Sequence, residues 1–268
     1  MADTSKGNRE TPNPAEAPSA PLILIPVTAE DEARRKRRIV LSCWAAALIV
    51  AGTAGWLYKR SVDPLHAMES YDAGVRLLKI ARYSQAILSF DRAVNLKPDL
   101  ADAYLMRGKA YVGEAKTERA IADFGKAIEL RPNDARALLE RAAAYLDLKD
   151  FQSAIQDTER ALRIDPKLAE GYNLRGTAWR GLADLQKALA DFTRAVELAP
   201  DADHLYQRGA TYQLLGDHKH AIDDFTQVIA IEPGASPSYF ARAESRRAIG
   251  DMQGAKADHT QGRIIDGR

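Results

Sequence analysis

A short pattern of apolar and polar residues returns along the chain at a nearly fixed interval. It reads RAVNLKP where it ends at Pro98, and similar segments follow four more times, with terminal prolines spaced by 34, 34, 34 and 33 residues. A fixed period of this length indicates an array of stacked structural repeats. Proline stops a helix, so each segment predicts the last turn of a helix and its end. The later segments end at Pro132, Pro166, Pro200 and Pro233.

Placing these prolines at position 32 of a repeat gives six repeats, which start at residues 67, 101, 135, 169, 202 and 236. Position 8 is always glycine or alanine, and position 20 is always alanine. Two antiparallel helices approach closely only where a side chain is small, so these positions predict a packed helix pair in each repeat. Asp150, Asp217 and Asp251 follow the turn between paired helices and suit the N-terminus of the second helix. Residues 67–268 are therefore expected to be all-α.

Two further positions are shared by most repeats. Position 11 is a large aromatic residue in four copies, and position 24 is phenylalanine in four copies. Repeat 3 has Thr158 at position 24, and repeat 6 has Arg246, His259 and Gly262 at positions 11, 24 and 27, so the sixth repeat is expected to pack loosely. With these residues, the segment 67–268 resembles the tetratricopeptide repeat family. The resemblance implies a right-handed superhelix of antiparallel helix pairs that binds a protein or peptide in its concave groove.

Charged residues also recur in register. Position 7 is arginine and position 23 is aspartate in repeats 2 to 6, whereas repeat 1 has Ala73 and Ser89 there. We expect a partly buried, bidentate ion pair between the two helices of each repeat. Such a pair sets register more than it adds stability, because desolvation offsets much of the attraction. The predicted structural ion pairs are Arg107 with Asp123, Arg141 with Asp157, Arg175 with Asp191, Arg208 with Asp224, and Arg242 with Asp258.

The resemblance also implies that positions 2, 5, 9 and 12 of the first helices line the groove, and these positions share one helical stripe. The stripe is apolar with scattered charge, which suits an extended or helical segment with apolar anchors. Tyr71, Val75 and Met106 stand where the carboxylate clamp of some co-chaperone members of the family would begin, so that clamp is not expected. The alternative is that the stripe only fills the inside of the superhelix. The candidate groove residues are Tyr71, Leu105, Lys109, Leu139, Asn173, Arg180, Tyr206 and Phe240.

The first quarter of the chain has a different pattern. Residues 1–38 are rich in Pro, Ala, Ser, Thr and charge, which predicts a disordered tail that ends in the basic cluster RRKRR. Residues 39–58 contain no charge and, as a helix, span about 30 Å, the thickness of a bilayer's hydrocarbon core. Trp56 and Tyr58 suit an interfacial aromatic belt. This pattern predicts a lipid-embedded transmembrane signal anchor at 39–58, followed by a linker at 59–66.

The basic residues lie mainly before this predicted span, so the positive-inside rule places the N-terminus in the cytoplasm and the repeats across the membrane. A cleaved signal peptide is the alternative, but its apolar core would be shorter and nearer the N-terminus. RRKRR also fits a nuclear localisation or nucleic-acid patch, although its position beside the apolar segment gives it a sufficient topological role. The expected location is a single-pass inner (plasma) membrane protein with a periplasmic array.

Composition and charge argue against several classes of function. The net charge is +1, with no clustered basic surface in the repeats, so no nucleic-acid partner is expected. Cys43 is the only cysteine, and His218 and His220 lack nearby carboxylate or histidine support in the sequence, so no metal site or cofactor is expected. No phosphate loop, nucleotide fingerprint or nucleophile elbow occurs. An enzyme in its own right is therefore not expected.

These patterns together predict a membrane-anchored scaffold or adaptor for a protein or peptide partner, which supports the assembly of a cell-envelope complex. A non-catalytic accessory or regulatory subunit of a membrane-associated enzyme is the alternative. The sixth repeat is not followed by a polar capping helix, as repeat arrays usually are. Its outer face is therefore expected to be covered by a partner or by a second copy of the chain, which gives a homo-oligomer, or to fray.

Overall fold

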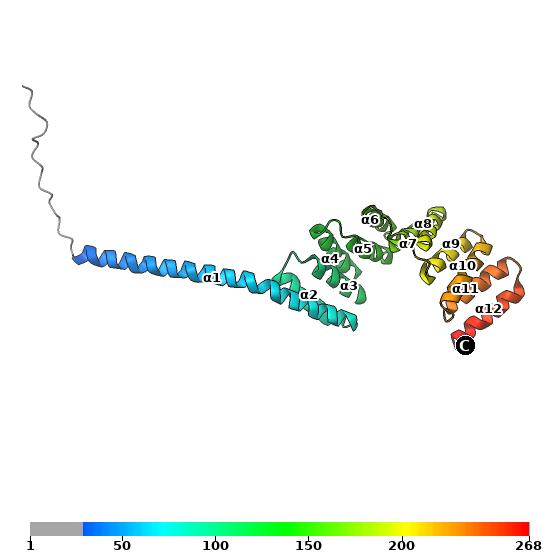
Figure 1. Cartoon of the computed structure of the whole chain (residues 1–268), viewed down its shortest axis with the longest axis horizontal. Helices are drawn as coiled ribbons and strands as arrows, with labels where there is room; N and C mark the ends of the chain where they lie inside the picture. The colour runs from blue at the N-terminus through cyan, green and yellow to red at the C-terminus, as the bar shows by residue number, and fades with distance from the viewer. Residues whose placement is uncertain (1–28, 268) are drawn as a thin grey trace, which may run out of the picture. The chain divides into compact units, whose positions relative to one another are not determined.

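The computed structural model describes residues 29–267, except for the side chains of residues 31, 35, 39, 43 and 54–62. This part of the chain forms twelve helices and contains no strand (Figure 1). The C-terminal part of α1 (Ala29–Lys79) is the first helix of repeat 1. The first helices of repeats 2 to 6 are α3 (Ala101–Gly113), α5 (Ala135–Asp147), α7 (Ala169–Gly181), α9 (Ala202–Leu214) and α11 (Ser236–Ala248). The second helices are α2 (Tyr83–Leu96), α4 (Thr117–Leu130), α6 (Phe151–Ile164), α8 (Leu185–Leu198), α10 (His218–Ile231) and α12 (Met252–Ile265).

Helix α1 differs from the predicted order of tail, span and linker. Residues 29–38 are helical rather than disordered, and residues 59–66 are helical rather than a linker. Glu, Ala, Arg and Lys dominate residues 29–38, and these are good helix formers. The helix also continues through Pro64. Residues 1–28, the rest of the predicted tail, lie outside the described residues.

The predicted span is described only in part. Within the residues that the structure describes, none of the helices combines the length and the apolar character needed to cross a membrane. Val40, Trp44 and Leu48 expose more than half of their surface, at 53%, 67% and 70%. The side chains of Trp56 and Tyr58 are not described. Membrane anchoring and self-association through the sixth repeat stay predictions.

Glycine at position 8 lets the two helices of a repeat approach each other. A Cβ atom built on Gly176 would lie 2.9 Å from the ring of Phe192, and one on Gly74 would lie 2.6 Å from the ring of Phe90. The phenylalanine side chains at position 24 are fully buried, which leaves no room for a methyl group at position 8. The same contact joins Gly108 to Phe124 and Gly209 to Phe225.

The two repeats without phenylalanine at position 24 have alanine at position 8. In repeat 3, which has Ala142 at position 8, Thr158 is fully buried and donates its hydroxyl to the carbonyl of Ala154 at 2.8 Å. In repeat 6, Phe240 from position 5 contacts the ring of His259 edge-on, with the centroids 5.4 Å apart. A Cβ on Gly262 would lie 2.8 Å from Phe240, so this glycine makes room for the aromatic ring of position 5. His259 itself is exposed, and the only buried residues of α12 are Ala255, Asp258 and Gly262, so loose packing of the sixth repeat stays a prediction.

The predicted ion pairs between arginine at position 7 and aspartate at position 23 form in all five repeats, and each pair is bidentate. Arg175 donates from Nε and Nη2 to the two carboxylate oxygens of Asp191, at 2.8 and 2.7 Å. Hydrogen bonding to this carboxylate raises the pKa of Arg175, against the opposing effect of burial. The other four pairs have the same two hydrogen bonds: Arg107 with Asp123, Arg141 with Asp157, Arg208 with Asp224, and Arg242 with Asp258.

Two of the five arginines also contact the repeat before their own. Arg107 Nη1 donates to Asp91 at 2.6 Å, and Arg242 Nη1 donates to the hydroxyl of Thr226 at 3.0 Å. Asp91 and Thr226 both occupy position 25 of the preceding repeat. These two arginines therefore connect the second helix of their own repeat to the second helix of the preceding one. Within the described residues, Arg141, Arg175 and Arg208 hold only the aspartate of their own repeat.

Introducing into repeat 4 the residues that repeat 3 has at positions 8 and 24, alanine and threonine, tests the contact between these positions. We expect Gly176→Ala alone to lower the free energy of unfolding by about 1–3 kcal/mol through overpacking. Phe192→Thr alone should lower it by about 3–5 kcal/mol through a cavity. The double variant should lose less than the sum of the two by about 1 kcal/mol or more, because the alanine methyl group enters the space that the ring leaves. Urea unfolding followed by circular dichroism measures this, and strictly additive losses would contradict the pairing.

Exchanging the charges of one ion pair tests its role in register. Because the side chain of Asp191 is only 10% exposed, Arg175→Asp or Asp191→Arg alone should cost about 2–3 kcal/mol of stability. The combined exchange should restore at least half of that loss. The matched control is the exposed pair of Arg194 and Glu197 on α8, where either single reversal should cost under about 1 kcal/mol. A double variant that is less stable than both single variants would rule out the pairing as the determinant of register.

Candidate functional site

The first helices form the inner side of the array. Consecutive first helices contact one another directly, from α3 to α5, α5 to α7, α7 to α9 and α9 to α11. Within the described part of the chain, the second helices make no such contacts with each other. A stack that is tighter on one side curves toward that side, so the first helices lie on the concave face. This face is the candidate groove.

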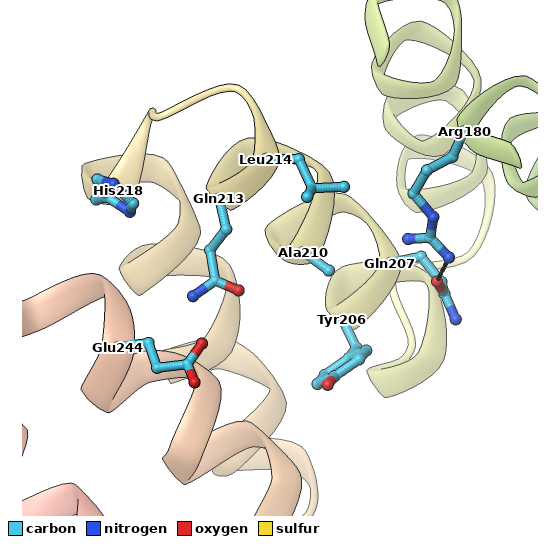
Figure 2. Close-up of a pocket in the computed structure, with 8 residues that line it drawn as sticks. All are labelled: Arg180, Tyr206, Gln207, Ala210, Gln213, Leu214, His218 and Glu244. Atoms are coloured by element: carbon cyan, nitrogen blue, oxygen red, sulfur yellow. Dashed lines mark hydrogen bonds between the residues drawn. The ribbon is translucent and has the colours of Figure 1, made fainter. Parts of the chain in front are cut away.

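One cavity of about 630 Å³ lies on this face across repeats 4 to 6 (Figure 2). We call it the C-terminal pocket. Helix α9 forms its floor with Tyr206, Ala210 and Gln213, while Arg180 enters from α7 and Glu244 from α11. The remaining lining residues are Gln207, Leu214 and His218.

A second cavity of about 300 Å³ lies on the same face across repeats 2 and 3, and we call it the N-terminal pocket. Leu105 and Leu139 form its apolar part, but they are only 3% and 5% exposed and belong mainly to the core. Lys109 forms an ion pair with Glu140 of the next first helix, beside this apolar surface. The pocket therefore combines apolar walls with a paired Lys109 and Glu140. Its other lining residues are Met106, Ala135, Arg136, Leu168 and Glu170.

Five of the eight candidate groove residues line these two pockets, and three do not. Tyr71 packs against Phe90 with a ring distance of 6.0 Å, and burial raises the pKa of its phenol, as do Asp102 and Asp72. Asn173 donates its amide to Asp203 at 3.0 Å. Phe240 packs inside repeat 6, as described above. Position 5 thus serves the interior of the repeat as much as the groove.

Arg180 differs from the arginines of position 7 in its hydrogen-bond partner, which is neutral. It donates to the amide oxygen of Gln207 at 2.7 Å, and its guanidinium lies 5.3 Å from the ring of Phe192. Among the described residues it forms no salt bridge with a carboxylate. Burial lowers the pKa of Arg180, with small opposing effects from Tyr206 and Asp203. Glu244, across the pocket, is exposed and also has no salt bridge in the described part of the chain.

Sequence reasoning missed several lining residues, above all Gln207 and Glu140. Both occupy position 6, which lies beside the predicted stripe and receives a polar side chain from the preceding first helix. Lys109 at position 9 reaches Glu140, and Arg180 at position 12 reaches Gln207. A charged or amide residue at position 6, one repeat after a cation at position 9 or 12, is the signal that could have identified them.

Two of the five histidines, His204 and His220, serve local structure. His220 lies 2.6 Å from Asp217 through Nδ1 and stacks on Tyr212 at 5.2 Å. His204 is buried and contacts the carbonyl of Ala199 at 2.8 Å. No group of three or more metal-ligating side chains occurs among the residues that the structure describes.

Comparison with known proteins identifies the repeats. Two family models described as tetratricopeptide repeat match the chain, one over residues 105–169 and the other over 169–201 and 202–234. Residues 105–234 are tetratricopeptide repeats. The predicted resemblance is thereby confirmed for the central part of the array. No curated protein sequence matches the chain significantly.

Solved structures show the same tetratricopeptide-repeat solenoid. MamA (residues 41 to the end) from Desulfovibrio magneticus RS-1 is 24% identical, with a TM-score of 0.58, over 63% of this chain and 97% of that one. YrrB, described as a TPR protein with an unusual peptide-binding site, is 23% identical, with a TM-score of 0.54, over 66% and 91%. PilF of Pseudomonas aeruginosa is 14% identical, with a TM-score of 0.67, over 76% and 93%. At these identities the comparison establishes the fold.

Proposed function

We propose that this protein is a scaffold that binds an extended segment of a partner protein along the concave face of its tetratricopeptide repeats. The observation that carries the proposal is the presence of two separate cavities on one stripe of first helices. Peptide recognition in grooves depends on a few side-chain pockets of this kind, while the rest of the segment makes shape contacts. The peptide-binding site of YrrB, a protein of the same fold, supports this function.

The two pockets differ in chemistry, which gives the partner segment a direction. The N-terminal pocket offers apolar walls from Leu105, Met106 and Leu139, and its cations Lys109 and Arg136 are paired with carboxylates. The C-terminal pocket offers Arg180 and Glu244, which have no salt bridge among the described residues. An apolar side chain therefore suits the first pocket and a polar one suits the second.

Filling the C-terminal pocket tests groove binding. Ala210 lies at its floor, so Ala210→Trp should place an indole where the partner segment passes and weaken binding at least tenfold. The matched control is Ala230→Trp, the same change at an exposed site on the second helix α10 of the same repeat. Binding of peptides selected from a random dodecapeptide display library, measured by fluorescence anisotropy with the full chain, gives the result. Equal binding by both variants would place the partner on another surface.

We further propose that residues 39–58 anchor the chain in a membrane and that the array lies on the extracytoplasmic side, where it supports assembly of a cell-envelope complex. The charge-free sequence of these residues and the preceding RRKRR support this arrangement. The exposed apolar side chains of Leu41, Leu48 and Ile49 also favour contact with lipid, since water-exposed surfaces rarely carry such a contiguous apolar stretch.

Two charges in the centre of the proposed anchor test it. Leu48→Arg combined with Ile49→Arg should release the full chain from carbonate-washed bacterial membranes, since each arginine costs about 2.5–3.5 kcal/mol at the bilayer centre. Leu88→Arg, at an exposed leucine of α2, should leave the chain in the membrane fraction. Protease added to spheroplasts should digest the array of the unmodified chain. A chain found in the soluble fraction, or an array protected from protease, would contradict the proposal.

A further inference from the structure

Arg180 has the environment of an arginine whose carboxylate partner comes from elsewhere. Each of the five arginines at position 7 is partly buried and holds an aspartate through two hydrogen bonds. Arg246 at position 11 of repeat 6 is also partly buried and contacts Asp258 at 2.8 Å. Arg180 is buried to a similar degree, yet its hydrogen-bond partner is the neutral amide oxygen of Gln207. Burying a cation without a counter-charge is costly.

We propose that Arg180 binds a single carboxylate of the partner segment inside the C-terminal pocket. This inference rests on the groove-binding function proposed above and adds the chemistry of the ligand. Arg180 is one of the residues that line the pocket, and its guanidinium contacts Gln207 there (Figure 2). A guanidinium offers five N–H donors, and the described contacts use one of them, so a bidentate contact with a carboxylate is open to it. The carboxylate would also reverse the effect of burial, which lowers the pKa of Arg180.

The surrounding groups restrict what else enters. Phe192 lies 5.3 Å from the guanidinium and forms an apolar wall beside it. Gln213 is already held, because its amide donates to the carbonyl of Ala241 and to the hydroxyl of Ser245, both at 2.8 Å. Among the residues that line the pocket, Arg180 is the side chain that always carries a positive charge, so it is the group best placed to bind an anion.

Glu244 limits the number of acidic groups. Its exposed carboxylate lines the same pocket from α11, so a second acid of the ligand would meet a like charge there. A run of acidic residues is disfavoured for that reason, and a segment with one acid next to apolar or cationic residues is favoured. The carboxylate can belong to an Asp or Glu side chain or to the C-terminus of the partner, and both sources present the same group to Arg180.

Peptide selection with the full chain tests the inference. The probe is a random dodecapeptide display library, presented once with a free C-terminus and once internally between fixed flanking residues. Selected peptides that compete at the groove, defined by their loss on Ala210→Trp, should be enriched in a single acidic residue. Enrichment in both formats identifies a side-chain carboxylate, and enrichment only with the free C-terminus identifies the terminal carboxylate. Both results support the proposal.

A double-mutant cycle then assigns the carboxylate to Arg180. Replacing the acid of the selected peptide by its amide should weaken binding to the unmodified protein about tenfold or more, the effect typical of a charge-assisted hydrogen bond. On Arg180→Gln the acid and amide peptides should bind alike. Arg180→Lys keeps the charge and should retain part of the preference, while Arg194→Gln, which removes the same charge from the outer helix of the same repeat, should retain all of it. Thermal unfolding of each variant verifies that the repeats stay folded.

The outcomes separate this inference from the proposed function. If peptides bind the groove but show no acid preference, or if Arg180→Gln keeps that preference, the carboxylate inference is wrong and the scaffold function stands. If no selected peptide is lost on Ala210→Trp, both are wrong. If Arg180→Gln unfolds, the unmodified protein and Arg180→Lys still test the inference. If the amide peptide binds as tightly as the acid peptide to both proteins, the inference is wrong.

Discussion

Close approach of the two helices at position 8 is the constraint on which the array depends. Where glycine stands there, the phenylalanine of position 24 lies against the bare backbone and is fully buried, as in Gly176 with Phe192. Where alanine stands there, in repeats 3 and 6, the phenylalanine is absent, and position 24 is Thr158 or His259. Glycine at position 8 therefore goes together with a ring at position 24. Because this contact recurs in four repeats, it gives four helix pairs the same packing, on which the stack of first helices depends.

The polar groups of the groove divide into those that hold the array together and those available to a ligand. Lys109 and Glu140, or Asn173 and Asp203, connect consecutive first helices and are occupied by each other. Arg180 and Glu244 have no salt bridge within the described residues. The distinction depends on the contacts of each side chain and not on its type, since Lys109 and Arg180 would look equivalent in composition.

Much of the fold could be predicted from the sequence, because each structural position occurs in several repeats and can be compared among them. The starts of α3, α5, α7, α9 and α11 and the Arg–Asp partners follow from positions that recur at a fixed period. The candidate site was harder to predict from the sequence, since it depends on residues that do not recur. Position 5 was expected in the groove, yet Leu105 and Leu139 are mainly core residues, and Gln207 was missed because position 6 has no shared residue type. The contact between Phe240 and Gly262 also needed the structure, because each residue alone reads only as a departure from the pattern.

The arginine that reaches back to the preceding repeat has a consequence for cooperativity. In a repeat protein, stability is roughly a sum of intrinsic terms for each repeat and coupling terms between nearest neighbours. Arg107 contributes to both kinds of term at once, because the same guanidinium holds Asp123 in its own repeat and Asp91 in the previous one. Opening of repeat 2 therefore also weakens its interface with repeat 1. At such a junction, the smallest unit that opens locally is a pair of neighbouring repeats and not a single helix pair.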